Sequence, residues 1–308
     1  MTNRKNSDII FLIPEGRFIM EKLIQYMTRA SLYEGAFDSM VGWSAAGMGY
    51  LAVTENGKLI MIDGGFGDDA EDIVKLLKAN GNADIPQIDL WIITHPHFDH
   101  YGALKEISKN ENLRSQISVA EIAYYFPEDF CGKDGKPGAL IGANNTLFDI
   151  VNEFGAEAYR PARDDEIVID GMKLKFLYVP DDCSILNRGG GNANLCSLIF
   201  TLESHNKKVM FTGDAYGRTM QLTAWRYHKE LKCDILQMPH HGLCDAYNAD
   251  FYHEVGASTL LIPISVAGDR TMHSDMYAKS EGCIANLCVE AKAKTVYKAF
   301  EGTVQIEL

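Results

Sequence analysis

A short apolar run that ends in a cluster of histidines constrains this chain more than any other stretch. Residues 88–93 hold five apolar or aromatic side chains, broken only by Asp89, and lead directly into the sequence THPHFDH at 94–100. The run is short enough for a buried strand and too short for a helix. Pro96 disfavours the helical conformation for the residue before it. We therefore predict a buried strand that ends in a loop carrying three histidines and Asp99.

The spacing of these side chains suits metal ions. Residues two apart in an extended segment point to the same side, so His95 and His97 are predicted to converge on one ion. Asp99 and His100 are adjacent and diverge, so we expect them to serve a second ion nearby. Imidazole and carboxylate ligands at this density suit zinc, with manganese or iron as alternatives. The expected cofactors are therefore two divalent metal ions, with zinc preferred.

The motif His95-x-His97-x-Asp99-His100, followed by Gly102, resembles the metal-binding signature of the metallo-β-lactamase superfamily. The resemblance implies an α/β fold, namely a four-layer αββα sandwich of two mixed β-sheets flanked by helices. It also implies that the metals lie at one edge of the sandwich, between the two sheets.

The resemblance covers residues 47–308. No repeat, low-complexity tract or linker marks a domain boundary, so residues 1–308 are predicted to form one domain. The first 46 residues match no family pattern, and we expect 1–46 to be a family-specific lid or a dimerisation element, the latter giving a homo-oligomer. Within them, Asp8–Ile13 is predicted to be a strand, and the apolar spacing over Arg17–Tyr33 predicts a helix.

An Asn-Gly pair at 56–57 predicts a hairpin between Met48–Thr54 and Lys58–Ile62, because both central turn positions tolerate positive φ. Asp63 follows the second strand in an Asp-Gly turn. In the superfamily this aspartate supports the metal loop from behind the ligands, so the resemblance assigns Asp63 to that role. A plain turn is the alternative.

Two further loops supply candidate ligands through the resemblance. The sequence TGDA follows the predicted strand Lys208–Phe211, and the family's aspartate at this place bridges both metals, which implies Asp214. The sequence PHHG follows the predicted strand Asp234–Met238. We favour His241 as the ligand of the second metal and His240 as a proton or hydrogen-bond donor to the substrate, with the reverse assignment left open.

A third loop departs from the family pattern. The sequence VPDD at 179–182 stands where relatives often have Pro-Gly-His, with the histidine completing the ligands of the first metal. Asp182 occupies that position, and a carboxylate is a legitimate replacement ligand. The alternative is a coordination position that is open to water or to the substrate.

The remaining candidates come from the branch of the superfamily that contains the hydrolase domain of the DNA-uptake protein ComEC. A glycine-rich stretch leads into Asn194 and Ser197, as in that branch, and glycines let the backbone approach a ligand closely. These two side chains are expected to orient the site or to contact substrate, and local turn capping is the alternative. His273, after the predicted strand Thr259–Pro263, is expected to contact substrate.

Composition limits the partners. The chain of 308 residues carries a net charge of −13, which argues against long nucleic acid as a substrate, because phosphate contacts need clustered Lys and Arg. A metal site with a local positive field still accepts a small phosphate ester. No apolar stretch reaches membrane-spanning length, and the basic start lacks a signal-peptide core. Seven scattered cysteines without a CxxC pair are typical of reduced thiols, so we expect a cytoplasmic protein.

The sequence therefore predicts a dinuclear metal hydrolase. Its attacking group would be a hydroxide generated when the metals lower the pKa of bound water. The ComEC-like features favour a phosphodiester or related small ester, and a lactone, thioester or β-lactam is the alternative within the class. Two other classes remain open: a di-iron redox protein on the same scaffold and a metal-stabilised binding protein without catalysis.

Overall fold

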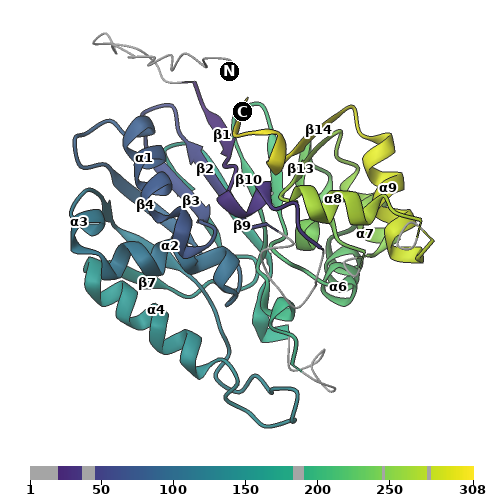
Figure 1. The fold of residues 1–308 in the computed structure, drawn as a ribbon, viewed down its shortest axis with the longest axis horizontal. Coiled ribbons are helices and arrows are strands. Elements are labelled where there is room, and N and C mark those ends of the chain that lie inside the picture. Colours follow the sequence, from purple (N-terminus) through teal and green to yellow (C-terminus); the bar gives the residue numbers. More distant parts are fainter. Residues whose placement is uncertain (1–19, 37–45, 183–190, 245–246, 276–278) are drawn as a thin grey trace.

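The computed structural model describes residues 20–36, 46–182, 191–244, 247–275 and 279–308, with the side chain of Asp182 left out. Two mixed β-sheets pack face to face, and helices cover the outer face of each (Figure 1). This is the predicted four-layer αββα sandwich. Among the described helices, none is both long and apolar enough to cross a membrane.

The first sheet has eight strands, and the helices that cover it alternate with its strands along the chain. Its order is β15 (Val304–Glu307), β1 (Lys22–Gln25), β2 (Gly49–Val53), β3 (Leu59–Asp63), β4 (Gln87–Ile92), β6 (Glu121–Ala123) and β7 (Glu157–Tyr159), with β5 (Ser118–Val119) beside β4. Its helices are α1 (Ala70–Asn80), α2 (Phe98–Lys109), α3 (Glu111–Arg114) and α4 (Ile141–Phe154).

The second sheet has seven strands. Its order is β14 (Thr295–Lys298), β13 (Thr259–Ile262), β12 (Ile235–Gln237), β11 (Lys208–Phe211), β10 (Ile199–Glu203), β9 (Met172–Tyr178) and β8 (Glu166–Ile169). Its helices are α6 (Gly217–Tyr227), α7 (Ala249–Val255), α8 (Val266–Met272) and α9 (Glu281–Lys292).

Alternation along the strands builds two apolar layers. Leu90 and Ile92 of β4 pack between the sheets, whereas Trp91 and Ile93 pack under the helices. Successive side chains of a strand point to opposite faces, so a run that is apolar at every position is buried on both sides. The histidine-rich segment therefore leaves a strand held rigidly in the middle of the sandwich.

Parallel pairing brings the ends of several strands to one edge. β4 runs parallel to β3 and to β6, and in the second sheet β12 runs parallel to β11 and to β13. The carboxyl ends of parallel strands share an edge of their sheet. The turns after β3, β4, β11 and β12, which carry the predicted metal-site residues, therefore meet there.

The sequence prediction for the segment before β2 needs correction. The described part of Arg17–Tyr33 is a strand, β1, and a short 3-10 helix, η1 (Arg29–Leu32), instead of a helix. Leu23 packs between the sheets and Ile24 packs on the opposite face, because β1 pairs with β2 on one side and β15 on the other. The strand predicted at Asp8–Ile13 lies outside the described residues.

The loop predicted to carry the three histidines and Asp99 is also partly helical. α2 starts at Phe98, with His97 as the residue that precedes its first turn. Asp99 and His100 therefore lie on the first turn of a helix, not on a free loop. The predicted hairpin around the Asn-Gly turn is confirmed as β2 and β3.

Candidate metal centre

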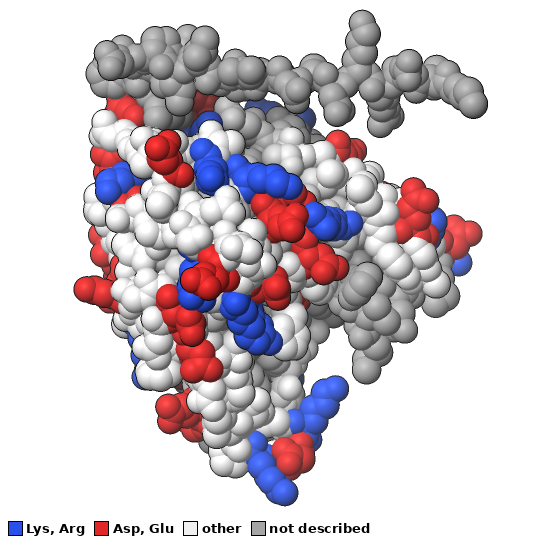
Figure 2. All heavy atoms as spheres, turned by 60° about the vertical axis from the view of Figure 1, so that its left-hand side comes forward, with Lys and Arg blue, Asp and Glu red and all other residues white. Residues whose placement is uncertain are grey.

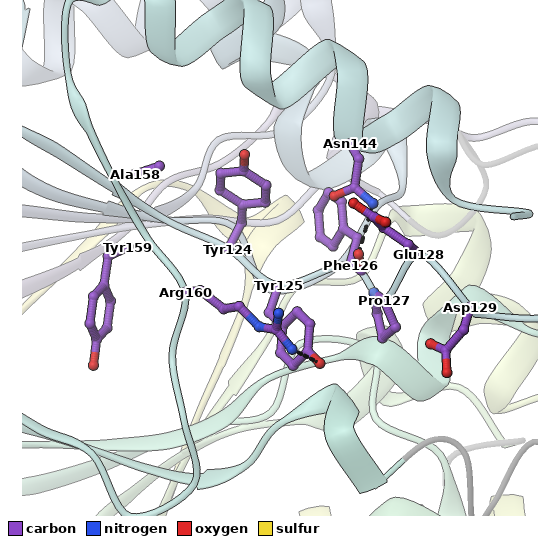
Figure 3. Close-up of a pocket in the computed structure, with 10 residues that line it drawn as sticks. All are labelled: Tyr124, Tyr125, Phe126, Pro127, Glu128, Asp129, Asn144, Ala158, Tyr159 and Arg160. Carbon is purple, nitrogen blue, oxygen red and sulfur yellow. Dashed lines mark hydrogen bonds between the residues drawn. The ribbon is translucent and has the colours of Figure 1, made fainter.

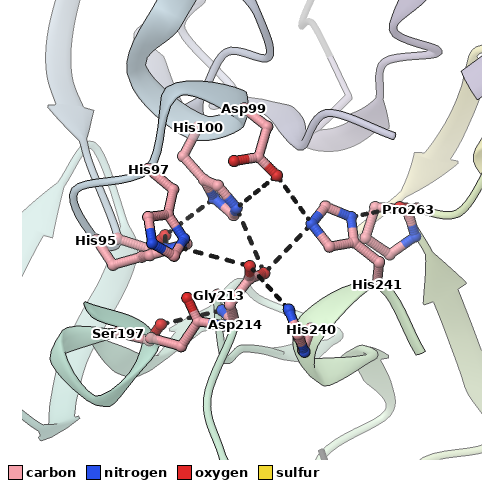
Figure 4. Close-up of polar contacts among 12 residues, drawn as sticks. His95, His97, Asp99, His100, Ser197, Gly213, Asp214, His240, His241 and Pro263 are labelled. Atoms are coloured by element: carbon pink, nitrogen blue, oxygen red, sulfur yellow. Dashed lines mark hydrogen bonds and ion pairs between the residues drawn. The ribbon is translucent and has the colours of Figure 1, made fainter. Parts of the chain in front are cut away.

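Six histidine and aspartate side chains converge at the shared edge of the two sheets (Figure 4). They form two groups, and within each group the potential ligand atoms lie within 4.8 Å of one another. Asp214 belongs to both groups. The first group is completed by His95 and His97, and the second by Asp99, His100 and His241.

The two oxygens of Asp214 face different groups. Its Oδ2 lies 3.5 Å from Nε2 of His95, whose Nε2 is in turn 3.0 Å from Nδ1 of His97. Its Oδ1 lies 3.3 Å from Nε2 of His100 and 3.5 Å from Nε2 of His241. A carboxylate that bridges two cations must direct one oxygen at each of them, and Asp214 has this arrangement.

The second group contains buried polar atoms without an aligned hydrogen bond. Nε2 of His100, Nε2 of His241 and Oδ1 of Asp214 have no hydrogen-bond partner among the described residues. Unsatisfied polar atoms of this kind are rare in protein interiors, and each requires an explanation such as a bound ion. Imidazole nitrogens and a carboxylate oxygen that converge on one point fit a divalent cation.

Charge divides the histidines into two kinds. Burial, together with the neighbouring histidines, lowers the pKa of His95 and of His97, so both rings are neutral and able to donate a lone pair to a cation. Burial also opposes the charged form of His100, but the carboxylates of Asp214, Asp63 and Asp99 outweigh it and hold the pKa of His100 well above its usual range. Burial likewise opposes the charged form of His241, but the carboxylates of Asp214 and Asp99 outweigh it and raise the pKa of His241 to about 10. A cation that binds these two rings therefore displaces protons.

Asp63 holds His100 from behind. Its Oδ2 lies 2.8 Å from Nδ1 of His100, and its Oδ1 accepts hydrogen bonds from the backbone N–H and the hydroxyl of Thr94. Asp63 adopts a left-handed backbone with φ of 53°, which aspartate tolerates better than most residues. The turn after β3 thus fixes the imidazole of His100 with Nε2 directed at the centre.

The turn after β12 is strained. His240 and His241 have φ of 44° and 57°, a left-handed conformation that costs roughly 1–3 kcal/mol at each non-glycine residue. Gln237 holds this turn to the turn after β11, because its Nε2 donates to the carbonyl of Gly213 and its Oε1 accepts from the N–H of Thr212. The two turns that supply Asp214 and His241 are therefore clamped together.

The sequence model of the metallo-beta-lactamase superfamily matches residues 47–259. The chain belongs to this superfamily. The match covers the turns that carry all six converging side chains, so the sequence motif and the spatial cluster agree.

Several solved structures share the fold. The metallo-β-lactamase fold protein YhfI from Bacillus subtilis aligns with a TM-score of 0.54 at 14% identity, covering 93% of this chain and 100% of its own. Tm1679, described as a metal-dependent hydrolase of the β-lactamase superfamily, aligns with a TM-score of 0.52 at 13% identity. The alignment covers 93% of this chain and 99% of Tm1679. A variant of the β-hydroxylase CmlA aligns with a TM-score of 0.52 at 14% identity. The alignment covers 97% of this chain and 55% of the CmlA chain.

Of the other predicted site residues, two contact Asp214 of the cluster, namely His240 and Ser197. Nε2 of His240 is 3.7 Å from Oδ2 of Asp214, and its side chain is 16% exposed, whereas His241 is buried. Ser197 accepts a hydrogen bond of 3.0 Å from the N–H of Asp214 through its hydroxyl. Asn194 is buried, and its Oδ1 has no hydrogen-bond partner among the described residues.

One predicted residue, His273, is not brought into the cluster, and the side chain of another is not described. His273 ends helix α8, is 45% exposed, and contacts the carbonyl of Asp269 and the carboxylate of Glu290. In the described residues it touches none of the metal-site side chains, because the loop after β13 forms α8 and carries it outward. The side chain of Asp182 lies outside the described residues, so its role as a ligand stays a prediction.

Sequence reasoning did not identify three supporting residues. Thr94 binds Asp63, Gln237 clamps two turns, and the carbonyl of Pro263 accepts from His241. The position of Thr94 beside His95 was a usable signal. A glutamine within an otherwise apolar strand was a second signal, because a buried amide must find partners. A backbone carbonyl leaves no signal in a sequence.

Proposed function

We propose that this chain is a hydrolase that uses two divalent metal ions, zinc preferred, to cleave a phosphodiester or a related small ester. The observation that carries the proposal is the division of Asp214 between two groups of ligand atoms. His95 and His97 would hold the first ion with Asp214. Asp99, His100 and His241 would hold the second with the same carboxylate.

Two ions bound there would supply Lewis acidity and a water of lowered pKa, which is the chemistry that ester hydrolysis needs. The protein supplies rigidity. The ligands come from buried strand ends and from the first turn of α2, and Asp63 and the carbonyl of Pro263 fix the rings of His100 and His241. Such support behind the ligands typically tightens metal binding.

His240 is the favoured proton or hydrogen-bond donor to the substrate. It lies next to Asp214 yet outside both groups of ligand atoms, and it is more exposed than His241. The centre of the Tyr216 ring lies 5.4 Å from the centre of the His240 ring, and this contact limits the movement of His240. A donor held at the edge of the centre can protonate a leaving group as the bond breaks.

The surface favours a small substrate over long nucleic acid. Figure 2 shows acidic and basic side chains interspersed on the described part of one face, without a continuous basic surface. The net charge of −13 opposes binding of a polyanion. The paired histidines, together with Asn194 and Ser197, support a phosphodiester as in the ComEC-like branch. Lactones, thioesters and β-lactams remain the substrates to test next.

A redox function is the second candidate, since one structure that shares the fold is a β-hydroxylase. The carboxylates of Asp99 and Asp214 also suit iron. Iron bound to the purified protein, with oxygen consumption and without hydrolysis, would favour this function over ours.

Metal analysis combined with a chromogenic phosphodiester tests the proposal. We expect two divalent ions per chain and release of nitrophenolate from bis-p-nitrophenyl phosphate, abolished by a chelator and restored by zinc or manganese. The matched controls are Asp214→Ala, which should lose activity, and His205→Ala, which replaces a surface histidine that pairs with Glu21. Two bound ions without hydrolysis of any ester would refute the proposal.

A further inference from the structure

A cavity of about 570 Å³ lies at the ends of β6 and β7 (Figure 3). Its lining includes Tyr125, which follows β6, and Arg160, which follows β7. β4, β6 and β7 run parallel, so these residues sit at the edge of the sheet where β4 delivers the metal motif. The N–H of Ile93 donates to the carbonyl of Ala123 over 2.9 Å, which ties the two strand ends together.

Arg160 is held in place by an aromatic ring and a carboxylate. Its guanidinium carbon lies 3.8 Å from the centre of the Tyr125 ring, a stacked cation–π contact. Its Nη2 donates to the hydroxyl of Tyr125 and, over 3.3 Å, to Oδ1 of Asp181. Tyr125 also donates to Asp181. The orientation of the guanidinium is therefore set before any ligand arrives.

The remaining donors of Arg160 are free to bind a ligand. Within the described part of the chain, Nε and Nη1 have no protein acceptor, and the side chain is 66% exposed. A guanidinium presents five N–H donors in a planar fork that matches a carboxylate or a phosphate. An arginine that is immobilised on one edge and open on the others loses little rotamer freedom on binding an anion.

The same cavity limits how much negative charge a ligand can carry. The exposed carboxylates of Glu128 and Asp129 also line it, and Asp181 already faces the guanidinium. A polyanion would be repelled by these groups. A ligand with one anionic group is favoured, because it gains the contact with Arg160 and has no further charge to repel.

We propose that Arg160, stacked on Tyr125, binds an anionic group of the substrate that lies apart from the bond to be cleaved. The substrate is then an ester with one carboxylate or phosphate beside its reacting centre. The metal centre would cleave the ester and Arg160 would select which esters bind, so this inference rests on the proposed function. Arg160 acts on recognition of the substrate and leaves the chemical step alone.

Paired substrates test the proposal. We would compare propyl p-nitrophenyl phosphate with its 2-carboxyethyl counterpart, which has nearly the same shape and an added carboxylate. Arg160→Met should raise KM for the carboxyethyl ester about tenfold or more, since charge-assisted hydrogen bonds are lost. It should leave kcat for both esters, and KM for the propyl ester, unchanged. A 2-phosphonoethyl ester shows whether phosphate or carboxylate is preferred.

The opposing explanation is that Arg160 serves only to hold Asp181 in place. A second variant, at Asp181, distinguishes this explanation from binding of an anion by Arg160. Asp181→Asn breaks the same ion pair but removes the carboxylate that competes for the guanidinium. Binding of an anion predicts that KM for the carboxyethyl ester falls in Asp181→Asn and rises in Arg160→Met. Arg160→Lys, which keeps the charge, should be intermediate. A shift in the same direction for Arg160→Met and Asp181→Asn, or equal effects on both esters, would overturn the inference.

Failure of the proposed function is distinguishable from failure of this inference. If no ester is hydrolysed, binding is measured on the metal-loaded protein by titrating propionate, which carries one carboxylate, and following the nitrogen-15 signal of the Arg160 side chain, assigned by its loss in Arg160→Lys. A saturable shift supports the anion site without hydrolysis. A signal that stays unchanged at high propionate concentration overturns the site, whatever the metal centre does.

Discussion

Nδ1 of His241 lies 2.6 Å from the carbonyl oxygen of Pro263. A carbonyl only accepts, so Nδ1 carries the hydrogen and Nε2 is the nitrogen left for other contacts. That Nε2 faces Oδ2 of Asp99 at 3.2 Å and Oδ1 of Asp214 at 3.5 Å. Metal-binding histidines are commonly oriented by such a hydrogen bond. This contact therefore favours His241 over His240 as the ligand.

The first prediction separates the two histidines. His241→Ala should reduce the bound metal from two ions to one per chain, because it removes a ligand of the second group only. His240→Ala should keep both ions and lower kcat about a hundredfold, as expected for loss of a proton donor. Plasma emission and steady-state kinetics measure the two effects. Loss of metal from the His240 variant alone would reverse the assignment.

The second prediction concerns stoichiometry. Asp214→Ala should lose both ions, because one of its oxygens faces each group. Asp99→Ala is the matched control, since Asp99 belongs to the second group alone, and one ion should remain. Metal content is measured after dialysis, with circular dichroism to confirm the fold. Two ions retained by the Asp214 variant would remove this residue from the centre.

The third prediction concerns support behind the ligands. Asp63→Asn keeps the size of the side chain and tolerates the left-handed backbone, but it removes the charge that holds Nδ1 of His100. We expect about a 10–100-fold loss of metal affinity, as is typical for residues behind ligands. Competition with a chromogenic chelator measures it. An affinity equal to that of the parent protein would show that Asp63 serves the turn alone.

The metal-site motif was readable from the sequence because its information is local. An apolar run followed by His95-x-His97 specifies a strand end with two rings on one side, whatever surrounds it. The family resemblance also pointed to Asp63 and Asp214, in the turns that follow β3 and β11. Their convergence could not be read from the chain, since it depends on which strands pair in parallel.

Other features required tertiary information. The apolar residues over Arg17–Tyr33 have a spacing that suits a helix, and only pairing with β2 and β15 makes Lys22–Gln25 a strand. His273 follows a strand end just as His241 does, yet α8 turns it outward. Arg160 was overlooked because a lone arginine has no motif. Its stacking on Tyr125 joins residues from two different strand ends.

The last prediction concerns stability at the opposite edge of the sandwich. Asp170, in the turn between β8 and β9, accepts hydrogen bonds from the hydroxyl of Thr54 and from the backbone and side chain of Asn56. These contacts join the turns of the two sheets. The hydrogen bonds from Thr54 and Asn56 lower the pKa of Asp170 below its usual 3.8. The ionised carboxylate therefore favours the folded state.

A lowered pKa contributes stability that is present above the unfolded value of 3.8 and is lost as pH falls through the lower folded value. Asp170→Asn should therefore reduce the free energy of unfolding at pH 7 by about 0.5–1 kcal/mol, a modest figure because Asp170 is partly exposed. The difference from the parent protein should shrink as pH drops below 3.8. Urea titrations of both proteins across this range measure it, and metal loss at low pH cancels in the comparison because Asp170 is remote from the centre. A difference that stays constant with pH would mean that the substitution acts through the turn backbone and not through the carboxylate charge.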